Sequence, residues 1–287
     1  MPHDAQRYRF LLIQPYSLPE GSKLQMRPAA GPKETALMNH ANIAHLLEGV
    51  DWDLHPGPLA PHGDGGVEMR EEFALAGVAR LPIVREACAS GRYNAIVLLG
   101  GGDPGFVEAR EIGRRYRIPV TACAHAQMHV ATMLGNKFGM IDVSEPHNMS
   151  MYDLVVRYRF TDKCAAICNI DFPLPRPGFS DGHPVREEAA KAARGEGSGM
   201  LEITVTAAVA AIEEDGAEVI IFGCSAAYWM QLPLQQRLHD LGWEVPVLEG
   251  YGCAIAQAKL LVDLGVDASG LAFPVDRPRR SRRKKVF

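Results

Sequence analysis

The stretch that decides the fold of this chain is Val219-Ile220-Ile221-Phe222-Gly223-Cys224-Ser225-Ala226-Ala227-Tyr228-Trp229. Its first four residues are bulky and apolar, which is typical of a strand buried on both faces in a parallel sheet. Cys224 follows a glycine at the carboxyl end of that strand, where open α/β sheets bind their ligands. We expect a helix to open at Ser225, so that its free N–H groups and positive end favour a thiolate at Cys224. A buried structural cysteine is the alternative interpretation, because cysteine is among the most buried residue types.

Composition places the chain among ordinary globular proteins. Its 287 residues are enough for one large α/β domain or two small ones. They are 47% hydrophobic and 22% charged, and no run of about 18 apolar residues offers a membrane span. The segment from Met1 to Arg7 lacks the apolar core of a signal peptide, and six scattered cysteines without a CxxC pair indicate free thiols. We therefore expect a cytoplasmic protein.

Charge is distributed without an overall bias toward a polyanionic partner. The net charge of −4 gives no general attraction to nucleic acid or to a membrane, so the expected partner is a small-molecule substrate. Residues 277–287 are locally basic, and we expect them to form a disordered tail. The Gly- and Pro-rich loop from Tyr16 to Pro32 is long enough to serve as a lid or as a subunit contact. We expect a homo-oligomer.

Strands alternate with helices along the chain, which predicts an α/β fold with parallel strands and right-handed crossovers. The expected strands cover residues 9–15, 52–55, 94–99, 118–122, 138–143, 165–168, 219–222 and 245–248. The expected helices cover residues 33–49, 68–90, 106–116, 125–134, 149–158, 187–213, 231–241 and 253–264. Two of these helices carry an expected interruption, one near Pro82 and one at residues 195–199.

Two segments of the chain repeat the same order of elements. Residues 94–135 and 218–265 each contain a strand, a turn, a helix, a Pro-Val strand and a second helix. This duplication predicts two pseudo-symmetric lobes, each a short parallel sheet flanked by helices, with the active site in the cleft between them. We assign residues 7–119 together with 250–287 to lobe 1, and residues 120–249 to lobe 2. In the alignment of the two copies, Gly100 is the counterpart of Cys224.

Several motifs carry a resemblance to a known family. They are Gly102-Asp103-Pro104-Gly105-Phe106 with Ala109-Arg110-Glu111, Pro119-Val120 with His129 and Phe138, Gly223-Cys224, and Pro246-Val247. Over residues 9 to 265 the chain resembles the aspartate/glutamate/hydantoin racemase superfamily, and within it most of all the hydantoin racemases. The resemblance implies two α/β lobes and no metal or other cofactor. It also implies two cysteines on either side of a carbon next to a carbonyl group, one removing a proton as thiolate and the other delivering one.

One of these two cysteines is missing from the chain. The resemblance places the second on Cys224 and the first on Gly100, which has no side chain. Racemisation by direct proton transfer needs an acid–base group on each face of the carbanion. Another side chain could replace the missing thiol, with Asp103, His125 and His147 as candidates for a second base. Otherwise the reaction is a one-sided decarboxylation or lyase step, or Cys224 is the nucleophile in hydrolysis or desulfuration of a (thio)hydantoin ring.

The family default is a racemase-like isomerase that acts on a hydantoin-like cyclic ureide or a small carboxylic acid. A non-catalytic ligand-binding protein is a further alternative, because a fold does not determine a function. His125 and His129 stand four residues apart, which is a spacing of metal ligands on a helix. No third ligand is evident from the sequence, so we expect no metal site.

The residues expected to bind substrate follow the ends of strands. The turn from Gly100 to Asp103 lets backbone N–H groups approach a ligand, where they would stabilise an enolate. The resemblance implies that the loop after the first strand holds the substrate, with Gln14 where the family usually has Asn. The complete expected set is Gln14, Tyr16, Ser17, Gly100, Gly101, Gly102, Asp103, His147, Asn148, Ser225 and Ala226.

Overall fold

Two parallel sheets form the framework of the protein. The computed structural model describes residues 7–25, 31–178, 184–276, 278 and 280–284. The first sheet has the strand order β2-β1-β3-β4 and the second has the order β6-β5-β7, with all neighbouring strands parallel. The strands are β1 (Tyr8–Ile13), β2 (Val50–His55), β3 (Ala95–Leu98), β4 (Val120–Ala122), β5 (Phe138–Asp142), β6 (Cys164–Asn169) and β7 (Val219–Phe222). The predicted α/β fold with helix-flanked parallel sheets is confirmed.

Apolar residues on both faces of the strands explain why each sheet is covered on both sides. In β1, Phe10 and Leu12 pack into one core, whereas Leu11 and Ile13 pack into another. All residues of β3 and β7 are buried. β3 is an inner strand of the first sheet, whereas β7 ends the order β6-β5-β7 and is flanked on its other side by the bridge from Ile220 to Val247. Val219–Phe222 therefore forms a fully buried strand of the second sheet.

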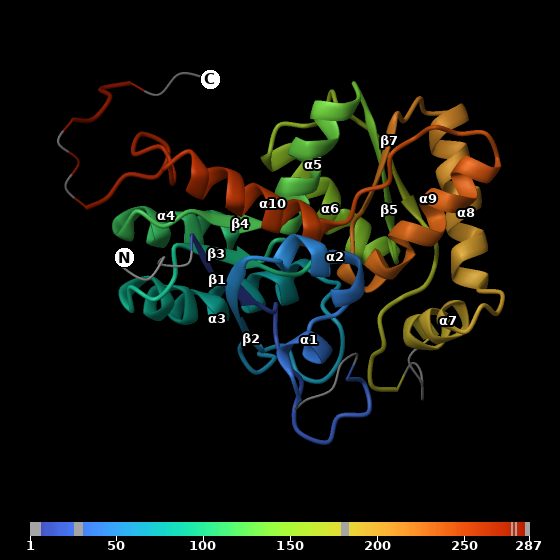
Figure 1. Ribbon diagram of the computed structural model, residues 1–287, viewed down its shortest axis with the longest axis horizontal. Helices are drawn as coiled ribbons and strands as arrows, with labels where there is room; N and C mark the ends of the chain where they lie inside the picture. The colour runs from blue at the N-terminus through green and yellow to red at the C-terminus, as the bar shows by residue number, and fades with distance from the viewer. Residues whose placement is uncertain (1–6, 26–30, 179–183, 277, 279, 285–287) are drawn as a thin grey trace.

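Helices connect the strands and cover the two sheets (Figure 1). They are α1 (Lys33–Ala36), α2 (His40–Leu47), α3 (Arg70–Ala89), α4 (Phe106–Tyr116), α5 (Cys123–Leu134), α6 (Glu145–Arg157), α7 (Pro184–Ala193), α8 (Gly199–Glu213), the 3-10 helix η1 (Ser225–Met230), α9 (Gln231–Asp240) and α10 (Gly250–Asp263). Helix α5 packs against β7 of the second sheet, and α10 packs against β3 and β4 of the first. Each lobe thus receives one helix from the other copy of the repeat, and the two helices lie side by side.

The internal repeat is visible in the order of the elements. β3, α4, β4 and α5 correspond to β7, η1 with α9, the segment around Val247, and α10. Val247 makes only an isolated parallel bridge to Ile220, so the expected strand at 245–248 shrinks to one position. The predicted lobe boundary before residue 120 cuts through the first sheet, because β4 pairs with β3 in the register Ile96 to Val120. The chain leaves the first sheet after β4, with α5.

Several helix boundaries differ from the sequence prediction. The expected helix at 33–49 is divided into α1 and α2, because Asn39 adopts a left-handed conformation between them. The interruption expected at 195–199 is confirmed, because α7 ends at Ala193 and α8 begins at Gly199, although α7 begins earlier than expected, at Pro184. Helix α3 continues through Pro82 without the expected break. Helix α6 begins at Glu145, so His147 and Asn148 lie in its first turn rather than in the expected loop.

The long loop after β1 is tied to the neighbouring loop after β2. Ser17 and Leu59 form a parallel bridge, and the Ser17 N–H donates to the Pro58 carbonyl at 2.8 Å. Residues 26–30 of the expected lid lie outside the described residues, as do residues 277, 279 and 285–287 of the basic tail. The described tail positions, 278 and 280–284, carry no helix or strand. Among the described helices, none combines the length and apolar character needed to cross a membrane.

Candidate active site

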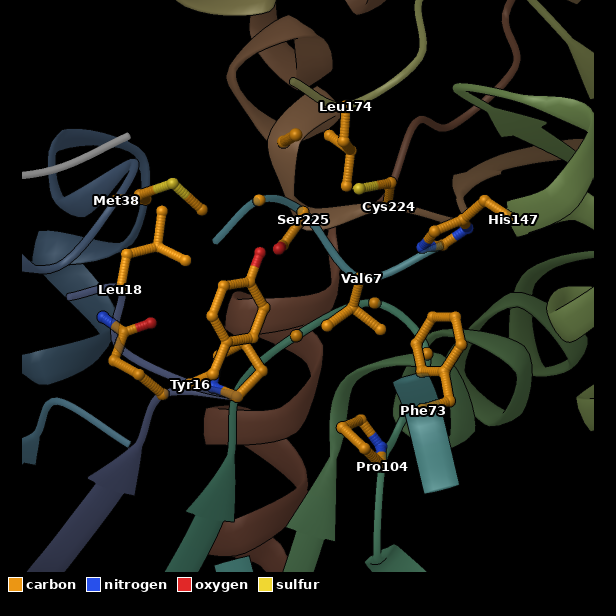
Figure 2. Close-up of a pocket in the computed structure, with 18 of the residues that line it drawn as sticks. Tyr16, Leu18, Met38, Val67, Phe73, Pro104, His147, Leu174, Cys224 and Ser225 are labelled. Carbon is orange, nitrogen blue, oxygen red and sulfur yellow. The ribbon is translucent and has the colours of Figure 1, made fainter. Parts of the chain in front are cut away.

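A pocket lies where the carboxyl ends of the two sheets meet. About 740 Å³ of space is free of atoms there, part of it open to solvent. Both lobes line it: Tyr16 and Pro104 follow strands of the first sheet, whereas His147 and Cys224 follow strands of the second (Figure 2). This is the location that the parallel-sheet rule predicts for a ligand site.

Cys224 occupies the end of β7 and borders this pocket. It is 4% exposed, and its carbonyl accepts a hydrogen bond from the Ala227 N–H at 3.0 Å as η1 begins. The Gly101 turn of lobe 1 approaches it closely. A Cβ atom on Gly101 would lie 1.8 Å from the Gly223 carbonyl oxygen and 2.8 Å from the Cys224 Cα. The absence of a side chain at Gly101 therefore allows the strand-end turns of the two lobes to meet beside the thiol.

A buried chain of polar side chains leads from Cys224 into lobe 2. His147 Nδ1 lies 2.8 Å from Asp142 Oδ2, and the His147 ring is also hydrogen-bonded to the Cys224 thiol. His147 is 2% exposed and Asp142 is fully buried. Burial alone would lower the pKa of His147, but the charges of Asp142 and Cys224 and their hydrogen bonds raise it well above its ordinary value. This arrangement favours the imidazolium form of His147.

Asp142 is held in place by its surroundings. Its Oδ1 accepts the Val143 N–H at 2.9 Å. Asn148, in the amide orientation that satisfies both of its polar atoms, donates to Asp142 Oδ2 at 3.1 Å and to the Ser144 carbonyl at 2.9 Å. A Cβ atom on Gly223 would lie 2.5 Å from the Asp142 carboxyl carbon, so the carboxylate packs directly on the backbone that precedes Cys224. Asn148 thus supports Asp142 and does not line the pocket.

Gly100 borders the same pocket from lobe 1, at the position where the resemblance expects the other thiol. Its φ angle is +106°, a backbone conformation that L side chains rarely adopt. A Cβ atom built there would lie 3.1 Å from Pro15 Cβ and 3.2 Å from Pro15 Cγ. The turn is therefore shaped for glycine, and a side chain at this position would be directed at the Pro15 ring.

Asp103 and His125, two candidates for a second base, are engaged away from the pocket. The Asp103 carboxylate accepts the N–H groups of Ala124 and His125, each at 2.8 Å, and the Tyr158 hydroxyl at 3.1 Å. Burial raises the pKa of Asp103 to about 7, against the opposing effect of these hydrogen bonds. The carboxylate thus anchors the start of α5, and neither Asp103 nor His125 lines the pocket.

The His125 and His129 pair packs at the surface of α5. The two Nε2 atoms are 3.1 Å apart, and the rings of Phe106 and Tyr158 pack against His125. Burial lowers the pKa of His125 to about 3, and the positive charges of His129 and Arg110 act in the same direction. Among the described residues, no group of three or more His, Cys, Asp or Glu side chains is placed to hold a metal ion.

The other expected binding residues fall into two groups. Gln14, Tyr16, Ser225 and Ala226 line the pocket, together with Gly101 and Gly102. Figure 2 shows Tyr16 and Ser225 reaching toward the pocket from different lobes. Gln14 is 2% exposed, and its buried Oε1 accepts no hydrogen bond from the described residues. Ser17 is outside the pocket, because its hydroxyl donates to the Pro58 carbonyl at 3.2 Å.

Apolar side chains that the sequence analysis did not single out form much of the wall. They are Leu18, Leu24, Met38, Val67, Phe73 and Leu174. The Phe73 ring meets the His147 ring with centroids 5.3 Å apart and an interplanar angle of 71°. No Asp, Glu, Lys or Arg side chain in the described part of the chain lines the pocket. The pocket is therefore suited to an uncharged group of a ligand, or to a charged group that has lost its bound water.

A clamp between the lobes holds two of these wall segments together. Arg176 donates to both oxygens of Glu72 at 2.7 Å and to Glu68 at 3.1 Å. The other Glu68 oxygen accepts the Ser144 hydroxyl at 2.6 Å and the Leu174 N–H at 2.9 Å. Burial raises the pKa of Glu72, but hydrogen bonds from Arg176 and the backbone lower it to about 2. We name Glu68, Glu72 and Arg176 the Arg176 clamp.

Comparison with known proteins places these features in a family context. The family model described as Asp/Glu/Hydantoin racemase matches residues 24–258. A hydantoin racemase of Paenarthrobacter aurescens is 28% identical over 207 residues, which are 72% of this chain and 78% of that protein.

Solved structures show the same fold. Allantoin racemase from Klebsiella pneumoniae has a TM-score of 0.66 at 24% identity, covering 94% of this chain and 95% of its own. A double mutant of arylmalonate decarboxylase in a liganded form has a TM-score of 0.55 at 11% identity, covering 89% of this chain and 92% of its own. At these identities the likeness concerns the arrangement of strands and helices.

Proposed function

The chain belongs to the Asp/Glu/hydantoin racemase family, and from that membership we propose that it is a cofactor-independent enzyme that transfers a proton on one face of a carbon next to a carbonyl group. Cys224 is the acid–base group. The substrate is a hydantoin-like cyclic ureide or a related small acid with an apolar substituent. The reaction is one-sided, which distinguishes it from racemisation by two opposed thiols.

The observation that carries this proposal is the contrast between the two strand-end turns. Cys224 borders the pocket with a histidine partner, whereas Gly100 offers no side chain and has a φ of +106°. Asp103 and His125 are engaged elsewhere, and His147 stands on the same side as Cys224. Among the described residues that line the pocket, no thiol, carboxyl or imidazole group stands on the Gly100 side.

The surrounding groups suit an enolate intermediate. The backbone of Gly101 and Gly102 lines the pocket, and no acceptor among the described residues is hydrogen-bonded to their N–H groups. Such donors stabilise the negative charge that develops on a carbonyl oxygen when the neighbouring carbon loses a group. Gln14 Oε1 can accept an N–H of a ureide ring.

Decarboxylation is a net reaction that needs a proton donor on one face only. When a carboxylate on the reacting carbon leaves as CO₂, the remaining enolate takes the Cys224 thiol proton on one face, and solvent then returns a proton to the thiolate. The apolar wall around Val67, Phe73 and Leu174 would favour loss of charge as CO₂ departs. On a substrate without that carboxylate, the same groups exchange the α-hydrogen with solvent and retain the configuration.

The family default, racemisation, and a non-catalytic binding role make different predictions. We would incubate each enantiomer of 5-benzylhydantoin in heavy water and follow deuterium by NMR and configuration by chiral chromatography. The proposal predicts deuterium incorporation with retained configuration, lost in Cys224→Ala and kept in the matched control Cys168→Ala. Equilibration of the enantiomers would refute one-sidedness, and a lack of exchange in the parent protein would refute proton transfer on this class.

A further inference from the structure

We propose that the same pocket has a second activity, the hydrolytic opening of a cyclic ureide ring, in which Cys224 is the nucleophile, His147 is the general acid and base, and Asp142 is a positioning residue. The inference rests on the site of the proposed function, but it assigns the thiol to a carbonyl carbon instead of a proton. It concerns bond cleavage in the ring, which proton transfer at the neighbouring carbon does not require.

The three side chains form the connected series that nucleophilic catalysis needs. His147 Nδ1 is committed to Asp142 Oδ2 at 2.8 Å, which leaves Nε2 as the nitrogen for Cys224. A nucleophile within hydrogen-bond reach of a base, with the base oriented by a third group, is the geometric signature of covalent catalysis. Asp142 is fully buried and itself fixed by the Val143 N–H, so the orientation of the imidazole is determined by the fold.

Ring opening uses this series for a further step, the delivery of a proton to a ring nitrogen. The His147 ring is enclosed by Phe73 on its edge and is 2% exposed, so a proton on Nε2 is held inside the pocket. Ring opening requires that proton, because the departing ring nitrogen must be protonated as its bond to carbon breaks. The charges of Asp142 and Cys224 hold the pKa of His147 well above its ordinary value, which keeps the proton available at neutral pH.

The opposite side of the pocket can stabilise the tetrahedral intermediate. A Cβ built on Gly101 would lie 2.8 Å from the Cys224 Cα, and Gly101, Gly102 and Cys224 line the same pocket. A ring carbonyl between the Gly101 and Gly102 N–H groups and the sulfur would direct its oxygen toward donors and its carbon toward Sγ. Gln14 Oε1, buried and without a partner among the described residues, can accept the adjacent ring N–H.

The steps balance without an added oxidant or cofactor. With the proton of the Cys224–His147 pair on His147 Nε2, the Cys224 thiolate forms an S–C bond with the ring carbonyl carbon. Collapse of the oxyanion breaks the ring C–N bond while His147 protonates the nitrogen, which leaves a carbamoylated acyl thioester. Water then attacks the thioester, gives a proton to His147, and displaces the thiolate, which restores the starting Cys224–His147 pair. The net reaction is cyclic ureide plus water to N-carbamoyl amino acid.

The experiment separates the two activities of the pocket in one incubation. Both enantiomers of 5-benzylhydantoin would be incubated with the protein in water that carries deuterium and ¹⁸O, and the products analysed by mass spectrometry. We expect N-carbamoylphenylalanine with one ¹⁸O in its carboxyl group, and an acid-quenched adduct on Cys224 equal in mass to the substrate. Asp142→Asn should reduce the rate at least 100-fold, and His147→Asn should abolish both product and adduct, whereas Cys168→Ser should leave them unchanged.

Alkylation of Cys224 tests its pairing with His147 without any substrate. At pH 6, iodoacetamide should modify Cys224 at least tenfold faster in the parent protein than in His147→Asn, with equal modification of Cys168 in both. Deuterium at the α-carbon without labelled acid would overturn the hydrolytic activity and leave the proposed function standing. Labelled acid without deuterium exchange would support the hydrolytic activity and refute the proposed function. Absence of both, or alkylation independent of His147, would overturn the nucleophile assignment.

Discussion

Replacing Gly100 with cysteine tests whether this site could be returned to a two-thiol racemase by one substitution. Gly100 has a φ of +106°, where a residue with a Cβ atom is strained by about 1–3 kcal/mol. The new Cβ would also press on Pro15 at 3.1 Å, so the ring must shift by a few tenths of an ångström. At about 2.1 cal/mol/K per residue, the 287-residue chain has an unfolding entropy near 0.6 kcal/mol/K. The expected loss in Tm is therefore about 2–5 °C.

Two matched variants separate strain from chemistry. Gly100→Ala carries the same Cβ without a thiol and should lose the same Tm in differential scanning calorimetry. Gly63 has a φ of +97° with nothing within 4 Å of a built Cβ, so Gly63→Ala isolates the conformational cost from the Pro15 contact. Because the built Cβ at Gly100 is directed at Pro15, we expect Gly100→Cys to leave the enantiomers of 5-benzylhydantoin unequilibrated.

Two results would refute this reasoning. If Gly100→Ala and Gly100→Cys keep the Tm of the parent protein, the turn is not held in a glycine-only conformation. If Gly100→Cys equilibrates the enantiomers while Gly100→Ala does not, a thiol at this position reaches the substrate. Racemisation would then be prevented by the absence of a thiol at position 100, and the backbone conformation of the turn would not prevent it.

Two further predictions concern the partner of the thiol and access to it. Asp142→Asn should lower the pKa of His147 in an NMR titration, because burial would then outweigh the remaining attraction. The pKa of His147 in the folded protein lies above its unfolded value of about 6.5. Protonated His147 therefore stabilises the folded state fully below about pH 6.5, and this stabilisation is lost as the pH rises through the folded pKa. The Asp142→Asn variant should lose this pH dependence of stability. Arg176→Ala removes largely buried ion pairs with Glu68 and Glu72, worth about 1–2 kcal/mol. Because these pairs hold the pocket wall in place, Cys224 should be alkylated about 5–30 times faster in this variant. Arg237→Ala removes a surface pair with Glu202 and should not change the rate.

The framework of the fold was predictable because its signals are local. A run such as Val219 to Phe222 is apolar at every position, and only a strand covered on both faces buries all four side chains. The carboxyl end of such a strand then fixes the location of Cys224 without knowledge of its neighbours. The repeat was visible for the same reason, since each copy uses the same order of short elements. The boundary of lobe 2 was misplaced because β4 pairs with β3, and pairing is not written in the sequence of one strand.

The pairing of His147 with Asp142 was not predictable from the residues alone. The residue pattern predicts a strand at 138–143, which ends near Asp142, and a helix at 149–158, which leaves His147 in the segment between them. Helix α6 instead begins at Glu145, directly after Ser144 and with a proline in its first turn. That local signal, a serine followed by Glu-Pro, is a recognisable helix start and could have placed His147 on a helix. Its direction toward Cys224 depends on the packing of α6 against the second sheet, which only the structure supplies.

The apolar wall and the Arg176 clamp could not be predicted from the sequence, for a different reason. Val67 and Leu174 lie in irregular loops, where no periodicity marks the side chains that face inward. Arg176 and Glu72 are 104 residues apart, and neither stands in a motif. Such contacts form where loops of the two lobes meet. Which loops meet depends on the packing of the lobes, and the local sequence of each loop does not show it.

The chemistry of the pocket follows from the asymmetry between its two strand-end turns. In lobe 2, the close packing of Asp142 on Gly223 places a buried carboxylate behind His147, and His147 then faces the thiol. In lobe 1, the corresponding turn supplies backbone N–H groups and a glycine-only conformation at Gly100. A duplicated fold would support two equivalent acid–base groups, but on our proposals one copy supplies the reactive thiol and the other the donors that stabilise charge. Proton transfer and ring opening could then share Cys224, since both need a thiol with a proton partner on one side and an anion site on the other.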